Sequence, residues 1–98
     1  MRFPGLRSKR PAQRLVPARH VVSTMHGERT VLLDARSGHY YGLDELASRI
    51  WSLMQEGHAP HHITELLYDE YDASREELES DVAGFIALLR KSKLLEEA

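Results

Sequence analysis

The sequence contains no cysteine, and this absence removes several kinds of site at once. A disulfide framework, a thiolate nucleophile and a Cys-based zinc site are all excluded. A chain without cysteine is compatible with a reducing compartment, and we expect a cytoplasmic location. With 98 residues, the chain is long enough for one hydrophobic core and too short for two.

Long apolar runs are also missing. No stretch approaches the ~20 consecutive apolar residues that cross a bilayer. The first twenty residues begin with basic side chains, but they lack the apolar segment of a secretory signal. We therefore expect no membrane contact.

Acidic residues are absent from residues 1–20, which hold six of the 13 Lys and Arg side chains. The rest of the chain carries the other seven bases and all 15 acids. We expect residues 1–13, interrupted by Pro4 and Pro11, to form a basic, disordered tail. Residues 14–98 should form the single folded domain. The alternative for the tail is contact with an acidic partner or a nucleic acid.

The chain also lacks the common catalytic arrangements. No serine lies in a G-x-S-x-G elbow, and glycines such as Gly38 and Gly42 are isolated, so no run of backbone amides can cradle a phosphate. The sequence therefore predicts no catalytic residues, no cofactor and no enzymatic activity.

Histidines are the remaining candidates for a site. His58, His61 and His62 have the spacing of metal ligands. They lie, however, at the start of a predicted helix, where the helix dipole disfavours a cation. We interpret them as surface side chains and expect no metal site.

Three segments have the alternation and β-branched composition of strands. They are residues 14–25, 29–35 and 39–43, separated by glycine-containing turns at 26–28 and 36–38. Such short connections predict an antiparallel meander. In the third strand, His39, Tyr41 and Leu43 alternate with Tyr40 and Gly42, so one tyrosine of the pair must lie outside whichever face is buried.

The sequence period then changes from 2 to 3.6 residues. Asp44 is the predicted N-cap of a first helix that ends near Gly57, and Pro60 suits the first position of a second helix. Ser74 and Glu77 form a capping box before a third helix. The predicted buried faces are Leu46, Ile50, Trp51, Leu53 and Met54, then Ile63, Leu66, Leu67 and Tyr71, then Leu78, Val82, Phe85 and Leu89.

These elements predict an α+β fold, winged helix-turn-helix-like, with a three-stranded antiparallel sheet followed by three helices. The closing residues 94–98 either add a short strand or pack against the body. A winged helix could bind DNA through its third helix. That helix begins "SREELESD", whose carboxylates would be repelled by phosphates, so nucleic acid is a disfavoured partner.

Several short motifs occur together at fixed distances: "GHYYGLD", "IWSLM", "YD", "SREE" and "DVAGF". In this combination, residues 15–97 resemble the PqqD-like family of recognition elements for ribosomally synthesised and post-translationally modified peptides (RiPPs). The family commonly has Asn where this chain has Asp44. Both residues cap helices, so this departure should be harmless.

The resemblance implies a non-enzymatic domain that binds the leader segment of a precursor peptide and presents it to modifying enzymes. Because the domain is not fused to an enzyme in this sequence, it most resembles the discrete carrier of lasso peptide systems. Its implied partners are the leader peptide and a leader peptidase, cyclase or other RiPP-modifying enzyme. The alternative function is a winged-helix DNA-binding regulator.

A free third strand could receive the leader as an additional strand, with side-chain pockets providing specificity. The expected site is the groove between the third strand and the third helix. Its candidate residues are His39, Tyr40, Tyr41, Gly42 and Leu43 on the strand, and Asp81, Val82, Phe85, Leu88 and Leu89 on the helix. For Val82, Phe85 and Leu89 the alternative is core packing, and for Asp81 it is an ordinary surface charge.

Overall fold

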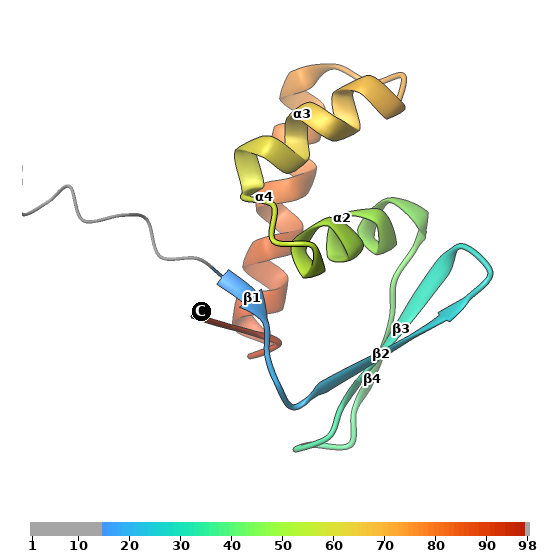
Figure 1. The fold of residues 1–98 in the computed structure, drawn as a ribbon, viewed down its shortest axis with the longest axis vertical. Coiled ribbons are helices and arrows are strands. Elements are labelled where there is room, and N and C mark those ends of the chain that lie inside the picture. The colour runs from blue at the N-terminus through green and yellow to red at the C-terminus, as the bar shows by residue number, and fades with distance from the viewer. Residues whose placement is uncertain (1–14, 98) are drawn as a thin grey trace, which may run out of the picture.

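The computed structural model describes residues 15–97, so the predicted tail at residues 1–13 lies outside the described residues. Within this range the chain forms strands and helices in the order β-β-β-β-α-α-α-β (Figure 1). Their bounds are β1 Leu15–Pro17, β2 Val21–His26, β3 Arg29–Asp34, β4 Tyr40–Gly42, α2 Glu45–Gln55, α3 Pro60–Glu70, α4 Arg75–Lys91 and β5 Leu95–Glu97.

Strands β2, β3 and β4 form the predicted antiparallel meander, in the order β2-β3-β4. Gly27 and Gly38 lie in its two turns with φ angles of +69° and +81°, a region that glycine adopts without the Cβ clash of other residues. In the middle of the sheet, Leu33 pairs with Val22 on one side and with Tyr40 on the other. The α+β class and the meander are therefore confirmed.

The first predicted strand, residues 14–25, is divided in the structure. β1 pairs with the closing strand β5, with Val16 opposite Glu96, and forms a separate two-stranded sheet. The chain then turns at Ala18, whose carbonyl accepts from the N–H of Val21 at 3.0 Å, and enters β2. Of the two alternatives for the closing residues, the structure has the strand.

The junction between β4 and α2 contains no linker because two side chains fix it. Asp44 is the N-cap of α2, and its Oδ1 accepts from the N–H of Ala47 at 2.8 Å. The buried hydroxyl of Ser48 accepts from the N–H of Thr30 at 2.8 Å and donates to the carbonyl of Leu43 at 3.3 Å. Helix α2 is therefore bonded to both β3 and the end of β4.

Helices α3 and α4 begin as predicted. Pro60 occupies the first position of α3, and the capping box of α4 is complete, because Ser74 and Glu77 each bond the other's backbone N–H. The expectation that Tyr71 is buried was wrong. It follows the last helical residue with an extended backbone, so it leaves the helical stripe, and its side chain is exposed.

The core lies between the helices and one face of the sheet. Its members have at most 9% of their surface exposed, and they include Leu32 and Leu43 from the sheet, Trp51, Ile63, Leu67, Leu78, Val82, Ile86 and Leu89 from the helices, and Leu94 before β5. In α4 the stripe differs from the prediction at one place, because Ile86 is buried and Phe85 is only half-buried. Across residues 15–97, no helix combines the length and apolarity needed to cross a bilayer.

Candidate functional site

The third strand of the meander, β4, is an edge strand. Among the described residues it pairs with β3 and with no other strand. Two hydrogen bonds join the residues that flank β4 to β3. The Leu43 N–H donates to the Thr30 carbonyl at 2.9 Å, and the Asp34 N–H donates to the His39 carbonyl at 2.9 Å. In an antiparallel pair, positions bonded to the partner alternate with positions whose N–H and C=O groups point away from it, so Tyr41 faces β3 and its two neighbours do not. The backbone groups of Tyr40 and Gly42 therefore face the open edge.

The turn before β4 is held by Asp34. Its Oδ1 accepts from the N–H groups of Arg36 at 2.9 Å and Ser37 at 3.3 Å. Burial raises the pKa of the Asp34 carboxyl, but these two N–H groups, together with the Ser37 side chain and the nearby His20, hold the pKa below its usual value. The carboxylate therefore stays ionised in neutral solution and fixes the turn that presents β4.

An apolar groove of about 540 Å³ runs between β4 and helix α4. Tyr41 on β4 and Leu43 just after it line one side, and Phe85 and Leu88 line the other side from the helix. Leu88 has 63% of its surface exposed, which is unusual for a leucine in a small domain of this kind. The complete lining is Leu32, Tyr41, Gly42, Leu43, Asp44, Ala47, Phe85, Leu88, Leu89, Ser92 and Leu94.

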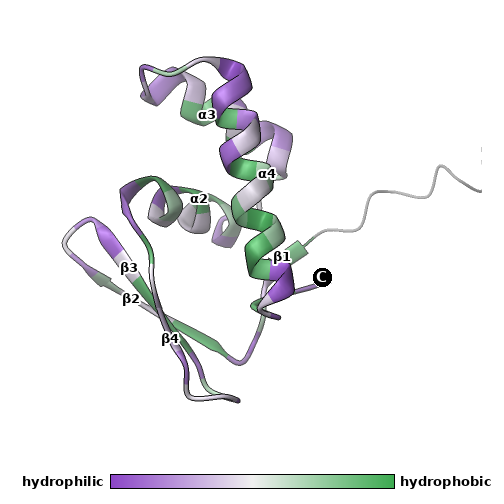
Figure 2. Cartoon of the chain, turned by 180° about the vertical axis from the view of Figure 1, so that it is seen from behind, coloured by the Kyte–Doolittle hydropathy of each residue, from purple (hydrophilic) through white to green (hydrophobic). Residues whose placement is uncertain are grey.

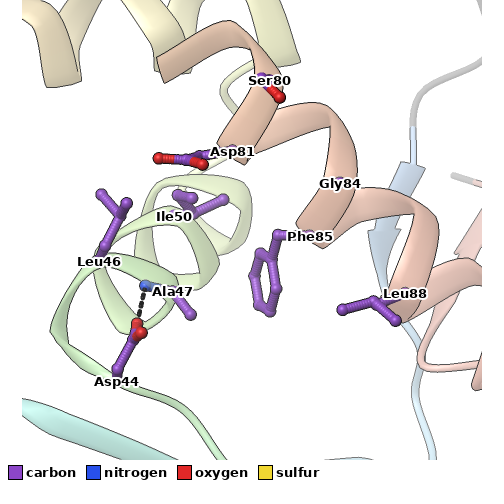
Figure 3. A pocket seen from close by; sticks show the side chains of 9 residues that line it. All are labelled: Asp44, Leu46, Ala47, Ile50, Ser80, Asp81, Gly84, Phe85 and Leu88. Carbon is purple, nitrogen blue, oxygen red and sulfur yellow. Dashed lines mark hydrogen bonds between the residues drawn. The ribbon is translucent and has the colours of Figure 1, made fainter. Parts of the chain in front are cut away.

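A second hollow of about 440 Å³ continues the groove between α2 and α4. Figure 3 shows the Phe85 ring projecting from α4 toward the start of α2, with Leu88 on the following turn and Asp81 on the preceding one. Four residues line both hollows, so the two form one continuous surface: Asp44, Ala47, Phe85 and Leu88. Gly84 has no heavy atom within 4 Å of the position of an added Cβ, so this wall remains open.

Most of the predicted site residues meet at this groove. Those that line it are Tyr41, Gly42, Leu43, Asp81, Phe85, Leu88 and Leu89. Three do not: Val82 is in the core with 2% exposure, Tyr40 points to the opposite face of the sheet with 71% exposure, and exposed His39 precedes β4. The ring of His39 nevertheless makes an edge contact with Tyr41, at 6.5 Å between centroids.

Several lining residues were not among the predictions. They are small or polar, namely Ala47, Ser80, Gly84 and Ser92, together with the apolar Leu32, Leu46, Ile50 and Leu94 and the cap Asp44. One signal could have found Ser92, because it continues a spacing that three predicted residues already share. Asp81, Phe85, Leu88 and Ser92 recur at i, i+4, i+7 and i+11, which places them on one face of α4 beside the core stripe.

The charged groups at the groove are carboxylates. Asp44 and Asp81 line it, and among the described residues neither hollow is lined by Lys or Arg. The start of α4 also carries exposed Glu76, Glu77 and Glu79. This helix would meet a phosphate backbone with charge of the same sign, which disfavours the DNA-binding alternative.

The histidine cluster does not form a metal site within residues 15–97. No three His, Cys, Asp or Glu side chains are grouped there so that they could hold an ion. His58 and His62 instead contact each other, with their Nδ1 atoms 3.0 Å apart, and Glu56 lies 3.5 Å from His58.

Comparisons with known proteins agree with this geometry. A family model described as Coenzyme PQQ synthesis protein D (PqqD) matches residues 29–95. A solved structure of TbiB1 in complex with the TbiA(beta) leader peptide is 38% identical to this chain, with a TM-score of 0.80 over 83% of this chain and 94% of that one. A structure of lasso peptide synthetase B1 complexed with the leader peptide is 26% identical, with a TM-score of 0.79 over 85% and 98%. Curated proteins give no match.

Proposed function

Because this chain belongs to the PqqD family of RiPP recognition elements, we propose that it binds the leader segment of a ribosomally synthesised precursor peptide. It is a non-catalytic domain, so its contribution is recognition. The two similar structures each hold a leader peptide. The observation that carries the proposal for this chain is the open β4 edge beside an apolar groove.

The leader binds as an additional strand beside β4. Tyr40 and Gly42 supply the unpaired N–H and C=O groups with which a guest strand can form a ladder. An exposed edge with unpaired backbone groups is also an aggregation hazard. An edge left open in this way is therefore more easily explained as a binding site.

The groove provides the sequence specificity that backbone pairing lacks. Every second side chain of a guest strand faces the helices, where Tyr41, Phe85 and Leu88 offer apolar contact. Burying one leucine-sized side chain there contributes roughly 1.5–3 kcal/mol. Asp81 can accept a hydrogen bond from the guest or pair with one of its cations. His39 supports the strand through its contact with Tyr41, and buried Val82 supports α4 from the core side.

The finer assignment is to lasso peptide biosynthesis, with a leader peptidase and a cyclase as the enzymes that receive the bound precursor. Its support is the 0.79 TM-score to lasso peptide synthetase B1. The genes beside this one test it directly. A precursor reading frame next to a protease and an ATP-dependent cyclase is expected, and modifying enzymes of another RiPP class would overturn the lasso assignment.

Leader capture is tested by fluorescence anisotropy with labelled leader peptides, first that of TbiA(beta) and then that of the precursor encoded beside this chain. We expect micromolar or tighter binding. Dissociation constants weaker than ~1 mM, or about −4 kcal/mol, for both leaders would reject specific capture.

Two substitutions at Gly42 test the binding mode. Gly42→Pro removes an outward-facing N–H and should lower leader affinity by about tenfold or more. It removes one hydrogen bond to the guest strand, and the proline ring also hinders the approach of that strand. Edge strands tolerate proline where the N–H faces solvent, so the fold should persist. Gly42→Ala is the matched control, because its Cβ meets no atom within 4 Å and the N–H remains. Equal affinities for the two variants would exclude pairing at this edge.

A further inference from the structure

The first described strand, β1, lies at one end of the leader groove. It pairs with β5, and just after it the Ala18 N–H donates to the carbonyl of Leu94 at 2.9 Å. Leu94 and Ser92, which follow α4, line this end of the groove. Figures 1 and 2 view the molecule from opposite sides, and both show β1 beside the last turns of α4. Residues 1–14, which precede β1 and lie outside the described residues, therefore join the domain next to the groove. We call them the N-terminal segment.

The N-terminal segment is long enough to follow the whole groove. The groove runs along α4 from Ser92 back to Asp81, and this part of the helix rises about 17 Å. An extended chain of the same length as the segment spans roughly 46 Å. Its residues 5–10, between Pro4 and Pro11, contain no proline, so each of them has the N–H that a strand beside β4 needs. The segment therefore has the length and the backbone groups to supply the strand that the β4 edge lacks.

The charge of the N-terminal segment is complementary to that of the groove. The segment has no acid, and its bases are Arg2, Arg7, Lys9, Arg10 and Arg14. The groove is lined by the carboxylates of Asp44 and Asp81, and across residues 15–97 neither of its hollows is lined by a base. At physiological ionic strength charges interact over roughly 8 Å, so a base gains from these carboxylates only if it lies close to them. Leu6, in the proline-free part, adds an apolar side chain for the wall formed by Phe85 and Leu88.

A carrier without leader exposes a surface that other chains can pair with. The backbone groups of Tyr40 and Gly42 face the open edge, and Leu88 beside it has 63% of its surface exposed. A segment tethered to the same chain is present at an effective concentration in the millimolar range. A weak contact is therefore enough for the N-terminal segment to cover this edge, and a leader with micromolar affinity can still displace it.

From these observations we propose that the N-terminal segment binds in the leader groove of the empty carrier, with residues 5–10 as a strand beside β4, and that the leader displaces it. The inference rests on the proposed leader binding at this groove. It makes the segment an internal competitor, so the affinity of every guest peptide falls by the fraction of carriers whose groove is free. The segment thereby sets a threshold that excludes peptides which pair with the open edge only weakly.

The first experiment measures competition in the full-length chain. Leader affinity is followed by anisotropy with the labelled leader of the precursor encoded beside this chain. The triple substitution Arg7→Gln, Lys9→Gln, Arg10→Gln keeps the length of the segment and removes its central charges, and it should tighten leader binding about fivefold. The gain should shrink as the salt concentration rises from about 0.05 M to about 0.5 M, because salt screens the attraction between the segment and the groove.

The matched control is the triple substitution Arg29→Gln, Arg90→Gln, Lys91→Gln. It changes the net charge by the same amount at exposed positions that do not line the groove, so leader affinity should stay within about twofold of the wild type. This control separates competition by the segment from a general effect of protein charge on leader binding. A gain in affinity that is equal in the two triple variants would overturn the competition.

The second experiment locates the segment directly. Because the chain has no cysteine, Ser8→Cys provides a single attachment point for a nitroxide spin label. We expect the label to broaden the amide NMR signals of Gly42, Ala47 and Gly84 at the groove more than that of Gly27 in the hairpin turn, and saturating leader should abolish the broadening. A diamagnetic analogue of the label is the control.

The outcomes separate this proposal from leader capture. Absence of broadening at the groove, or broadening that persists with saturating leader, would overturn the proposal and leave leader capture standing. Broadening that passes from spin-labelled chains to unlabelled, isotope-enriched chains in a mixture would assign the contact to a second copy and overturn it as well. Broadening at the groove in a protein that binds no leader would instead overturn leader capture, and with it the competition.

Discussion

Helix α4 carries two side-chain stripes that lie next to each other and differ in what covers them. At two places adjacent residues belong to different stripes: Val82 and Ile86 are buried in the core, whereas Asp81 is exposed and Phe85 is half-buried beside the groove. One helix therefore contributes to the fold with one stripe and offers a binding wall with the other. The comparison teaches that substitutions one position apart should separate stability from recognition.

The largest expected effect is on the core stripe. Ile86→Ala should lower the free energy of unfolding by about 2–4 kcal/mol, because it removes a buried side chain and leaves a cavity. Leader affinity of the folded protein should change by less than twofold. Urea unfolding followed by Trp51 fluorescence measures the first quantity, and Ile86→Val, which should cost only about 0.5–1.5 kcal/mol, is the control. A smaller loss for Ile86→Ala than for Phe85→Ala would contradict the assignment of the stripes.

The next effect is on the groove stripe, at the neighbouring residue. Phe85→Ala should weaken leader binding at least tenfold, since it removes the largest apolar surface of the wall. It should lower the free energy of unfolding by only about 1–2 kcal/mol, because the ring is half-buried. Anisotropy and urea unfolding give the two values. Phe85→Leu, which keeps an apolar side chain, should restore most of the affinity; a variant as weak as Phe85→Ala would mean that ring geometry, not apolar area, is recognised.

The prediction placed Phe85 in the core, whereas the structure buries its neighbour Ile86, and the reason is simple. From Val82, both i+3 and i+4 continue a helical stripe, and both residues are apolar. The choice between them depends on where α2 and α3 pack, which periodicity does not contain. The pairing of β1 with β5 was also beyond the sequence, because its partners are about eighty positions apart and no local signal joins them.

Other parts were predictable because their causes are local. The cap Asp44 and the box formed by Ser74 and Glu77 act over three residues, so their spacing alone predicts the helix starts. The open edge followed from the strand order of a meander, in which the third strand is always terminal. The small lining residues Ala47 and Gly84 escaped prediction because they shape the groove by having little side chain, and an apolar pattern gives no signal for that.

A smaller effect is expected where the groove stripe reaches solvent. Leu88→Ala should weaken leader binding about fivefold to tenfold, since roughly 1 kcal/mol of apolar contact is lost. The free energy of unfolding should stay within about 0.5 kcal/mol of the wild type, because 63% of this side chain is already exposed. Arg90→Ala, an exposed change on the same helix outside the groove lining, is the control. Unchanged leader affinity would place the bound leader away from this turn of α4.

The smallest effect is expected at a polar contact that serves the fold alone. Arg49 on α2 binds Glu70 on α3 through two hydrogen bonds of 3.0 and 2.7 Å, away from the groove. This bonding holds the pKa of the Glu70 carboxyl below its usual value of 4.5, so the pair stabilises the protein at neutral pH, and the contribution is lost as the pH falls through the lowered pKa. Both side chains are 37% exposed, so a double-mutant cycle of Arg49→Met and Glu70→Gln should give a coupling of only about 0.2–1 kcal/mol at pH 7. The coupling should shrink at pH 3 and leader affinity at pH 7 should be unchanged; a coupling that persists in acid would show that it does not depend on the ionised carboxylate.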